Sequence, residues 1–145
     1  MDILKTGKFL SKKDKDIEEK ELPDTPLVAI YFTAHWCPPC RQFTPILGTF
    51  YEEVNEDEDN KVLEVIFCSS DKTQAAFNEY FEKMDWMAIP FVDDRSLKLK
   101  SHFSVTGIPR LIVMNRKGDI ISQNARMDVT QKGPQVIEEW MNKIN

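Results

Sequence analysis

The sequence is poor in cysteine and contains no long hydrophobic run. Three cysteines in 145 residues are too few for a disulfide framework. No apolar stretch approaches the length of a membrane span, so no membrane association is expected. The opening stretch MDILKTGKFLSKKDKDIEEKEL is interrupted by charge too often to hold the apolar region of a signal peptide. These absences predict a cytoplasmic or nuclear protein, in a compartment where thiols stay reduced.

Positive charge is outweighed by negative charge. The chain has 19 Lys and Arg residues against 24 Asp and Glu residues, a formal net charge of −5. Binding of nucleic acid requires a basic face for the phosphates, so nucleic acid is not expected as a partner. The acidic stretch EEVNEDEDN at residues 52–60 is expected to end a helix in a solvated loop, with an acidic docking patch as the alternative.

The length of 145 residues predicts a single domain over residues 1–145, which is long enough to bury a core. Residues 1–24 are expected to form a charged extension or hairpin ahead of that core. Within them, the mixed charges of residues 11–21 predict a solvated turn or loop. The sequence shows neither an internal repeat nor a low-complexity linker, and we expect a monomer.

The hydrophobic pattern alternates between strand and helix. The unbroken apolar run Leu27–Phe32 is typical of a strand that is buried in a parallel sheet, and the run Val62–Cys68, which only Glu64 interrupts, is interpreted in the same way. The other predicted elements are a helix over residues 41–54, a helix that follows a capping box of Asp71 and Gln74, a hairpin over residues 110–122 and a helix over residues 136–144. This order predicts an α/β fold with a central mixed β-sheet flanked by helices on both faces.

The motif WCPPC at residues 36–40 follows the first of these strands directly and opens the next helix. Ligands in open α/β sheets bind at such carboxyl ends of strands. Pro38 and Pro39 suit the first helical turn, where φ is already favourable and N–H groups lack partners. Cys37 then lies at the helix N-terminus, where the helix dipole favours a thiolate, and Cys40 lies one turn further in. The pair therefore predicts an exposed nucleophile and a more buried resolving thiol.

A pair of cysteines can also bind metal or close a structural disulfide. A structural zinc site needs four ligands, and the remaining candidates Cys68, His35 and His102 show no second pair at ligand spacing. A structural disulfide between Cys37 and Cys40 would close a loop too small to constrain the unfolded chain much. Redox exchange is therefore the favoured interpretation. We expect no metal and no cofactor beyond a redox-active Cys37–Cys40 disulfide.

The stretch VTGIPRL at residues 105–111 places a Gly-Ile-Pro turn before the predicted hairpin. If Pro109 is cis, the backbone of Ile108 turns toward the sulfur of Cys37 and can pair with an incoming disulfide peptide as an extra strand. The alternative is an ordinary proline at the start of a strand.

Four stretches together, in the order YFTAHWCPPCRQFTP, DWMAIPF, VTGIPRLIV and NAR, carry a family resemblance. Over residues 25–130 they resemble the tryparedoxin and nucleoredoxin branch of the thioredoxin superfamily. The resemblance implies a thioredoxin fold, a dithiol–disulfide cycle at Cys37 and Cys40, a stacked Trp36 and a cis bond at Pro109.

Three positions depart from the pattern of these families. Thioredoxins proper carry a buried Asp on the strand before the motif, whereas this chain has Tyr31, as tryparedoxins do, so a proton shuttle through that carboxylate is unavailable. Tryparedoxins carry Trp-Asp-Glu after the second central strand, whereas residues 70–72 are Ser-Asp-Lys and lack the Glu that would favour a polycationic dithiol. Arg110 replaces the more common Thr after Pro109, and its cation favours acidic peptides.

Four further residues are predicted to lie at or near the substrate groove. Trp36 is expected to contact substrate, and Trp86 is expected in the core or the groove wall. The resemblance places Arg41 and Arg126 at the border of the site, where they either steer anionic substrates or pair with the many acidic residues.

The histidines and the third cysteine are given ordinary structural roles. His35 is expected to be a solvated loop residue, with help in holding the thiolate as the alternative, and His102 is expected at the surface. Cys68 is expected to pack as a small hydrophobic residue, with a regulatory thiol as the alternative.

The sequence therefore predicts a thiol–disulfide oxidoreductase that reduces protein disulfides, including those of peroxiredoxin-type peroxidases. Its electrons would come from an upstream reductase or a small dithiol, because no flavin or nicotinamide site is recognisable. The alternative is a redox-regulated protein-binding module, against which the presence of Cys40 counts. An oxidase or isomerase ranks third.

Overall fold

A computed structural model describes residues 7–13 and 16–144. Residues 1–6, 14–15 and 145, which belong to the expected N-terminal extension and the end of the chain, lie outside the described residues. The strands are β1 (Phe9–Lys13), β2 (Asp16–Lys20), β3 (Leu27–Thr33), β4 (Leu63–Ser69), β5 (Met87–Ala88), β6 (Arg110–Asn115) and β7 (Ile120–Ser122). The helices are α2 (Pro38–Val54), α3 (Gln74–Phe81), α4 (Arg95–His102), α5 (Ala125–Lys132) and α6 (Val136–Met141), with short 3-10 turns η1 (Glu58–Asn60) and η2 (Gly133–Gln135).

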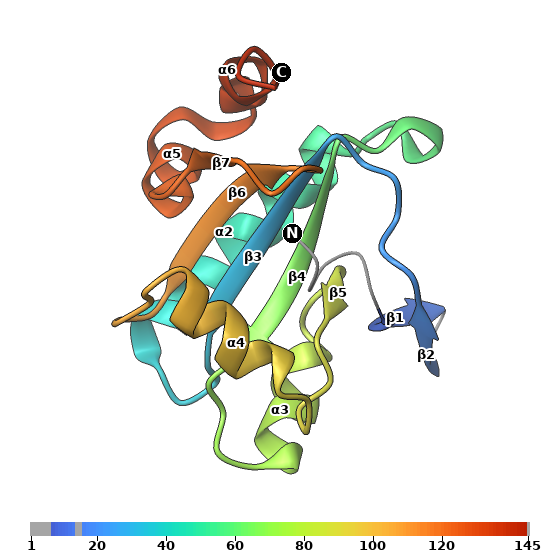
Figure 1. The fold of residues 1–145 in the computed structure, drawn as a ribbon, viewed down its shortest axis with the longest axis vertical. Helices are drawn as coiled ribbons and strands as arrows, with labels where there is room; N and C mark the ends of the chain where they lie inside the picture. Colours follow the sequence, from blue (N-terminus) through green and yellow to red (C-terminus); the bar gives the residue numbers. More distant parts are fainter. Residues whose placement is uncertain (1–6, 14–15, 145) are drawn as a thin grey trace.

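All seven strands form one sheet in the order β2-β1-β5-β4-β3-β6-β7 (Figure 1). Strand β3 runs parallel to β4, and β4 runs parallel to β5. The outer pairs and the β3–β6 pair are antiparallel, so the sheet is mixed as predicted. The two predicted apolar runs form the central strands β3 and β4, because both faces of each strand are covered.

Alternate residues of the central strands face two separate cores. Tyr31 belongs to the core that β3 shares with α2, α3, α5 and α6. Its neighbours Ile30 and Phe32 belong to the other core, which Leu99 of α4 closes. Figure 1 shows α4 in front of the sheet and α2 behind it. Helices therefore flank both faces, which confirms the predicted fold class.

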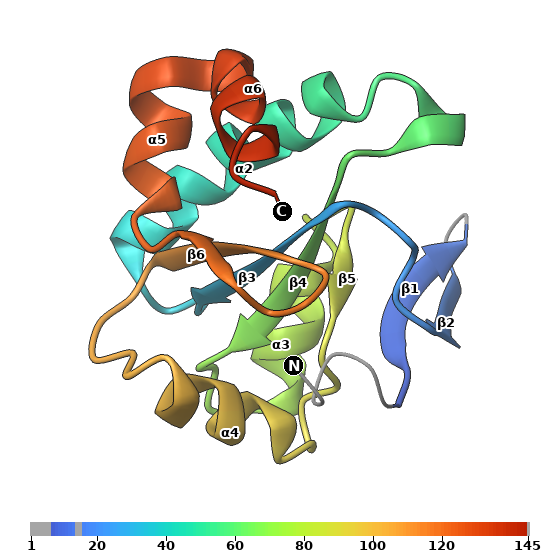
Figure 2. The ribbon, with the colours of Figure 1, turned by 45° about the horizontal axis from the view of Figure 1, so that its top comes forward.

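The solvated turn or loop expected over residues 11–21 is wrong, because β1 and β2 form an antiparallel hairpin there, which is one of the two forms expected for residues 1–24. Phe9 is fully buried and anchors this hairpin, while the charged side chains of β2 remain largely exposed. A strand at the edge of a sheet can carry such mixed charges. The hairpin joins the sheet through the pairing of Leu10 with Ala88, and it lies at the edge far from α5 and α6 (Figure 2).

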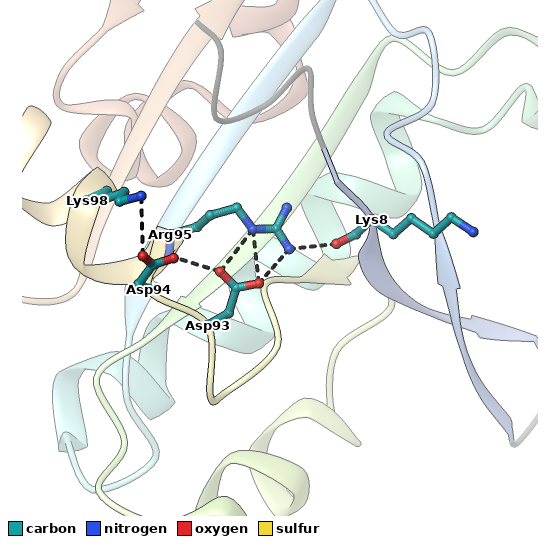
Figure 3. Close-up of polar contacts among 5 residues, drawn as sticks. All are labelled: Lys8, Asp93, Asp94, Arg95 and Lys98. Carbon is teal, nitrogen blue, oxygen red and sulfur yellow. Dashed lines mark hydrogen bonds and ion pairs between the residues drawn. The ribbon is translucent and has the colours of Figure 1, made fainter.

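Arg95, the first residue of α4, also holds the start of this hairpin. Its guanidinium donates to the carbonyl oxygen of Lys8 at 2.7 Å and to the carboxylate of Asp93 at 2.8 Å (Figure 3). On the next turn of the helix, Lys98 pairs with Asp94 at 3.3 Å. The N-terminal strands are thus tied to the helix that covers one face of the sheet.

Two helices, α4 and α5, were not predicted. Helix α5 buries only Ala125 and Val129, so its sequence shows no apolar stripe. Helix α2 begins at Pro38, where the WCPPC motif was predicted to open it, and the predicted C-terminal helix is α6, which ends at Met141. Among the described residues, no helix combines the length and apolar character needed to cross a membrane.

Candidate active site

The two proline residues determine how Cys37 and Cys40 are arranged at the start of α2. Pro38 and Pro39 occupy the first two helical positions, as predicted. Proline has no backbone N–H, so the first N–H that the helix offers is that of Cys40. It donates to the sulfur of Cys37 at 3.4 Å, and Cys37 therefore caps the helix with its own side chain.

The two sulfurs differ in burial less than the sequence suggested. Cys37 is only 5% exposed, so the expectation of an exposed nucleophile is wrong in degree. Its side chain turns inward to the N–H of Cys40, which is the physical reason for this burial. Cys40 is fully buried, and both cysteines are free thiols. The neighbouring Trp36 is 54% exposed and stands at the surface beside them.

The segment after β4 supports the loop that carries the cysteines. The indole N–H of Trp36 donates to the carbonyl oxygen of Ser70 at 3.0 Å. The backbone N–H of His35 donates to the carboxylate of Asp71 at 2.7 Å. The ammonium of Lys72 lies 5.6 Å from the centre of the Trp36 ring. The Ser-Asp-Lys stretch, which the sequence marked only as a departure from tryparedoxins, therefore contacts the motif directly.

The capping box predicted for Asp71 and Gln74 is wrong. Thr73 caps α3 instead, and its hydroxyl accepts the backbone N–H of Ala76 at 3.1 Å. The carboxylate of Asp71 is engaged elsewhere, because it also accepts the hydroxyl of Ser69 at 2.7 Å. A one-dimensional capping pattern could not show that the carboxylate turns back toward the WCPPC loop.

His35 lies next to the WCPPC motif, whereas His102 and Cys68 lie elsewhere in the fold. His35 is half-buried with its ring 5.4 Å from the ring of Tyr80, so the expected solvated loop histidine is wrong. His102 is exposed, as expected. Cys68 is fully buried in the core on the α4 side, as expected, and its thiol donates to the carbonyl oxygen of Ser96 at 3.7 Å. Burial raises the pKa of Cys68 to about 11.

The bond between Ile108 and Pro109 is cis, as predicted. Arg110, the next residue, pairs with Phe32 across the antiparallel β3–β6 ladder. Ile108 and Pro109 therefore lie at the end of β3 from which the WCPPC loop departs. Pro109 is buried and Ile108 is half-buried.

A cavity of about 410 Å³ opens next to this turn, between β6 and α5. Its lining includes Pro109, Arg110 and Arg126, but no acidic side chain among the described residues. The guanidinium of Arg110 donates to the carbonyl oxygen of Gln123 at 3.2 Å. In the part of the chain that the structure describes, Arg110, Arg126 and the exposed Arg41 form no ion pair.

Hydroxyl groups from three elements meet beneath Cys40. Tyr31 occupies the position that the sequence analysis compared with a thioredoxin aspartate, and its hydroxyl lies 2.8 Å from that of Thr44 on α2. The hydroxyl of Tyr80 on α3 lies 2.6 Å from Thr44 and 2.7 Å from Thr33. Sequence reasoning did not identify Thr33, Thr44 or Tyr80 as site residues.

The environment of Cys40 disfavours its ionised form. Burial is the main reason that the pKa of Cys40 is raised to about 11, and the hydrogen bond with Cys37 adds to it. A hydrogen bond from Thr33 and one from the backbone of Ala34 act in the opposite direction.

Trp86 is buried, as expected, with its ring centre 6.1 Å from that of Tyr31.

Comparison with known proteins agrees with this geometry. A family model described as thioredoxin-like matches residues 25–120. The probable nucleoredoxin 1 of Arabidopsis thaliana is 43% identical over 106 residues, which are 73% of this chain but 18% of that protein. The chain thus spans less than a third of the nucleoredoxins that it matches.

Tryparedoxins match over most of their length. The tryparedoxin of Trypanosoma brucei brucei is 42% identical over 118 residues, which are 79% of each chain. A solved structure of tryparedoxin II complexed with glutathionylspermidine is 32% identical and superposes with a TM-score of 0.77, covering 93% of this chain and 92% of that one.

Proposed function

The chain belongs to the thioredoxin-like oxidoreductase family, and we propose that it reduces protein disulfides by a dithiol–disulfide cycle at Cys37 and Cys40. The observation that carries this proposal is the asymmetric pair at the start of α2. Cys37 caps the helix next to the exposed Trp36, and Cys40 lies fully buried behind it. A thiol at a helix N-terminus is suited to attack, and a second thiol one turn away is suited to displace the product.

The cycle has two balanced steps. The thiolate of Cys37 attacks one sulfur of the substrate disulfide, and the other sulfur leaves with the electron pair and takes a proton from solvent. The thiolate of Cys40 then attacks the sulfur of Cys37. The Cys37–Cys40 disulfide forms and the second substrate thiolate leaves, to be protonated by solvent. The substrate has gained two electrons and two protons, and an upstream reductase or a small dithiol restores the thiols.

The surface around the Ile108–Pro109 turn is suited to hold a peptide. Strand β6 begins to pair with β3 at Arg110, so the backbone of Ile108 just before it is proposed to pair with an extended substrate segment. Trp36 offers an exposed aromatic face for the same segment. The cavity that Arg110 and Arg126 line favours an acidic residue near the substrate cysteine, and the exposed Arg41 adds positive charge.

The positive charge of Lys72 affects which electron donor the protein can use. The solved tryparedoxin II complex holds glutathionylspermidine. In this chain, the cation of Lys72 lies over Trp36 at the position where the resemblance implies a Glu. A cation there repels a polycationic dithiol, so we propose that the donor is a neutral or anionic dithiol or a reductase. Peroxiredoxin-type peroxidases remain proposed electron acceptors.

A redox titration and a turnover assay test this function. We expect a two-electron transition between about −270 and −200 mV, and reduction of a protein disulfide such as that of insulin when dithiothreitol is supplied. Cys37→Ser should abolish turnover, whereas the control Cys68→Ser should retain it. A potential near −120 mV would indicate an oxidase instead. If a Cys37→Ser/Cys40→Ser variant shows no turnover but captures partners as well as the unsubstituted protein does, the binding module would be favoured.

Two peptide disulfides that differ only in Glu or Gln beside the cysteine extend the same assay. The Glu peptide should be reduced with a severalfold higher kcat/KM at low salt. Arg110→Thr should remove this preference, whereas Arg116→Thr, which changes an arginine paired with Asp24, should keep it. Equal rates for both peptides in the unsubstituted protein would contradict the acidic preference alone.

A further inference from the structure

The hydroxyls beneath Cys40 form a continuous chain. Its order is Thr33, Tyr80, Thr44 and Tyr31, with oxygen–oxygen distances of 2.7, 2.6 and 2.8 Å. None of these residues is more than 5% exposed. Buried hydroxyls need hydrogen-bond partners, and here all four find them in one continuous chain rather than in separate pairs.

Both ends of this hydroxyl chain meet Cys40. At one end, Thr33 acts on the thiol of Cys40, because a hydrogen bond from its hydroxyl lowers the pKa of that thiol. At the other end, the hydroxyls of Tyr31 and Thr44 reach the carbonyl oxygen of Cys40 at 3.3 and 3.0 Å. The chain therefore acts on Cys40 both at its thiol and at its backbone carbonyl.

The direction of donation along the chain is reversible. At each of the three links either oxygen can be the donor. In one arrangement the thiol of Cys40 donates to Thr33, and the protons point from Thr33 toward the carbonyl end. In the other arrangement every hydroxyl turns, so that Tyr80 donates to Thr33 and Thr33 donates to the sulfur of Cys40. Each hydroxyl donates once in both arrangements, so the reversal leaves none unsatisfied.

We propose that this hydroxyl chain stabilises the Cys40 thiolate in the resolving step by reversing its donors, and so replaces the buried carboxylate found on the preceding strand in thioredoxins. The proposal rests on the proposed function, because it concerns the second step of that cycle. It assigns positioning roles to Thr33, Tyr80, Thr44 and Tyr31, none of which contacts the substrate.

The proton and electron balance of the step is unchanged by the chain. Cys40 releases its proton to solvent, the hydroxyls turn, and Thr33 donates to the resulting thiolate. The thiolate attacks the sulfur of Cys37, and the substrate thiolate leaves with the electron pair. As the negative charge leaves Cys40, the hydroxyls are free to return. A chain of donors that polarise one another stabilises an anion more than a single hydroxyl does.

The groups around Cys40 fit this role. The titratable groups that face it are Cys37 on its own helix, Tyr31 on β3 and Tyr80 on α3, whose ring packs under His35. Burial raises the pKa of both tyrosines, so both stay protonated and able to donate. The hydrogen bond from Thr33 lowers the pKa of the thiol, in the direction that the chain requires.

The test separates the two chemical steps with Ellman's reagent. Attack by Cys37 releases one thionitrobenzoate, and resolution by Cys40 releases the second, so stopped-flow absorbance gives a rate for each. The resolving rate in the unsubstituted protein should rise with pH until Cys40 is ionised. Thr33→Val and Tyr80→Phe should slow resolution about tenfold at neutral pH and move its pH midpoint upward. Thr33→Ser should restore both.

Tyr51→Phe is the matched control. Tyr51 lies on α2, the helix that carries Cys40, but its buried hydroxyl donates to Glu64 and not to the hydroxyl chain. This substitution should leave the resolving step unchanged even if it lowers Tm. Unchanged midpoints in Thr33→Val and Tyr80→Phe, or an equal shift in Tyr51→Phe, would overturn the proposal. Loss of the first release in the unsubstituted protein would instead contradict the proposed function.

Discussion

Helix α2 carries a buried polar cluster at each end, and the two clusters differ in kind. The N-terminal cluster contains thiols and hydroxyls, and each link between its hydroxyls can reverse. The C-terminal cluster contains Asn55 and Glu64, whose amide and carboxylate groups have donors and acceptors in fixed positions. A reversible cluster is suited to follow a change of charge, and a fixed cluster is suited to hold backbone in place.

The fixed cluster joins α2 to β4. The side-chain oxygen of Asn55 accepts the backbone N–H of Val62 at 2.9 Å and that of Leu63 at 3.2 Å. Its amide nitrogen donates to the carbonyl oxygen of Leu63 at 2.8 Å. The carboxylate of Glu64, which is 3% exposed, accepts the hydroxyl of Tyr51 at 2.9 Å. These bonds set where the chain re-enters the sheet after the acidic loop.

The largest expected difference between the clusters is in turnover. Cys40→Ser should lower disulfide reduction on the order of a thousandfold, because the mixed disulfide at Cys37 then lacks a resolving thiol. The variant should accumulate that mixed disulfide, which mass spectrometry detects as an adduct of the substrate. Unfolding in urea should show little change in stability. Retained turnover without an adduct would place the resolving thiol elsewhere.

The next effect belongs to the fixed cluster and concerns stability. Asn55→Ala leaves two backbone N–H groups and one carbonyl without their partner, and we expect a loss of roughly 2–4 kcal/mol in the free energy of unfolding. The resolving rate of the folded protein should not change. Asn60→Ala, which removes an exposed amide bonded to Asp57, is the control and should cost less than about 0.5 kcal/mol. Equal losses would show that the buried cluster contributes nothing special.

The smallest effect is the dependence of stability on pH at Glu64. Burial is the main cause that raises the pKa of Glu64 in the folded chain, against hydrogen bonds from Tyr51 and Val65. The folded state therefore holds the proton more tightly than the unfolded state does. This contribution is full below the ordinary glutamate pKa and is lost as the pH rises through the raised value.

Glu64→Gln removes this titration and keeps a side-chain oxygen for Tyr51. Relative to the unsubstituted protein, its free energy of unfolding should improve as the pH rises from about 4 toward neutrality, by on the order of 1 kcal/mol. Urea unfolding at several pH values measures the difference. Glu52→Gln, on the exposed side of α2, should leave the curve parallel. A difference for Glu64→Gln that falls with pH would reverse the argument.

The sequence predicted those elements whose burial can be recognised from their own residues alone. The runs Leu27–Phe32 and Val62–Cys68 are apolar at every position or nearly so, because both of their faces are covered. Helix α5 escaped prediction because only two of its residues are buried. A hairpin was among the forms expected for residues 1–24, but residues 11–21 were interpreted as a loop because β2 is mostly charged, while its partner strand is anchored by Phe9.

The site was predictable as far as its chemistry lies within a few neighbouring residues. The spacing of Cys37, Pro38, Pro39 and Cys40 dictates a helix start and a thiol pair. The contacts of Asp71 and the hydroxyl chain could not be found in this way. Thr33, Thr44 and Tyr80 come from a strand and two helices, and Tyr80 is 47 residues from its partner Thr33. Only the packing of three elements brings these oxygens together.

The two edge strands of the sheet determine whether one molecule can add a strand to the sheet of another. Strand β2 is largely exposed and four of its five residues, DIEEK, are charged, while β7 at the other edge is three residues long. Aggregation by strand addition needs a long edge of low charge as its template, and neither edge supplies one. Neither edge strand therefore offers a template for the sheet of a second molecule.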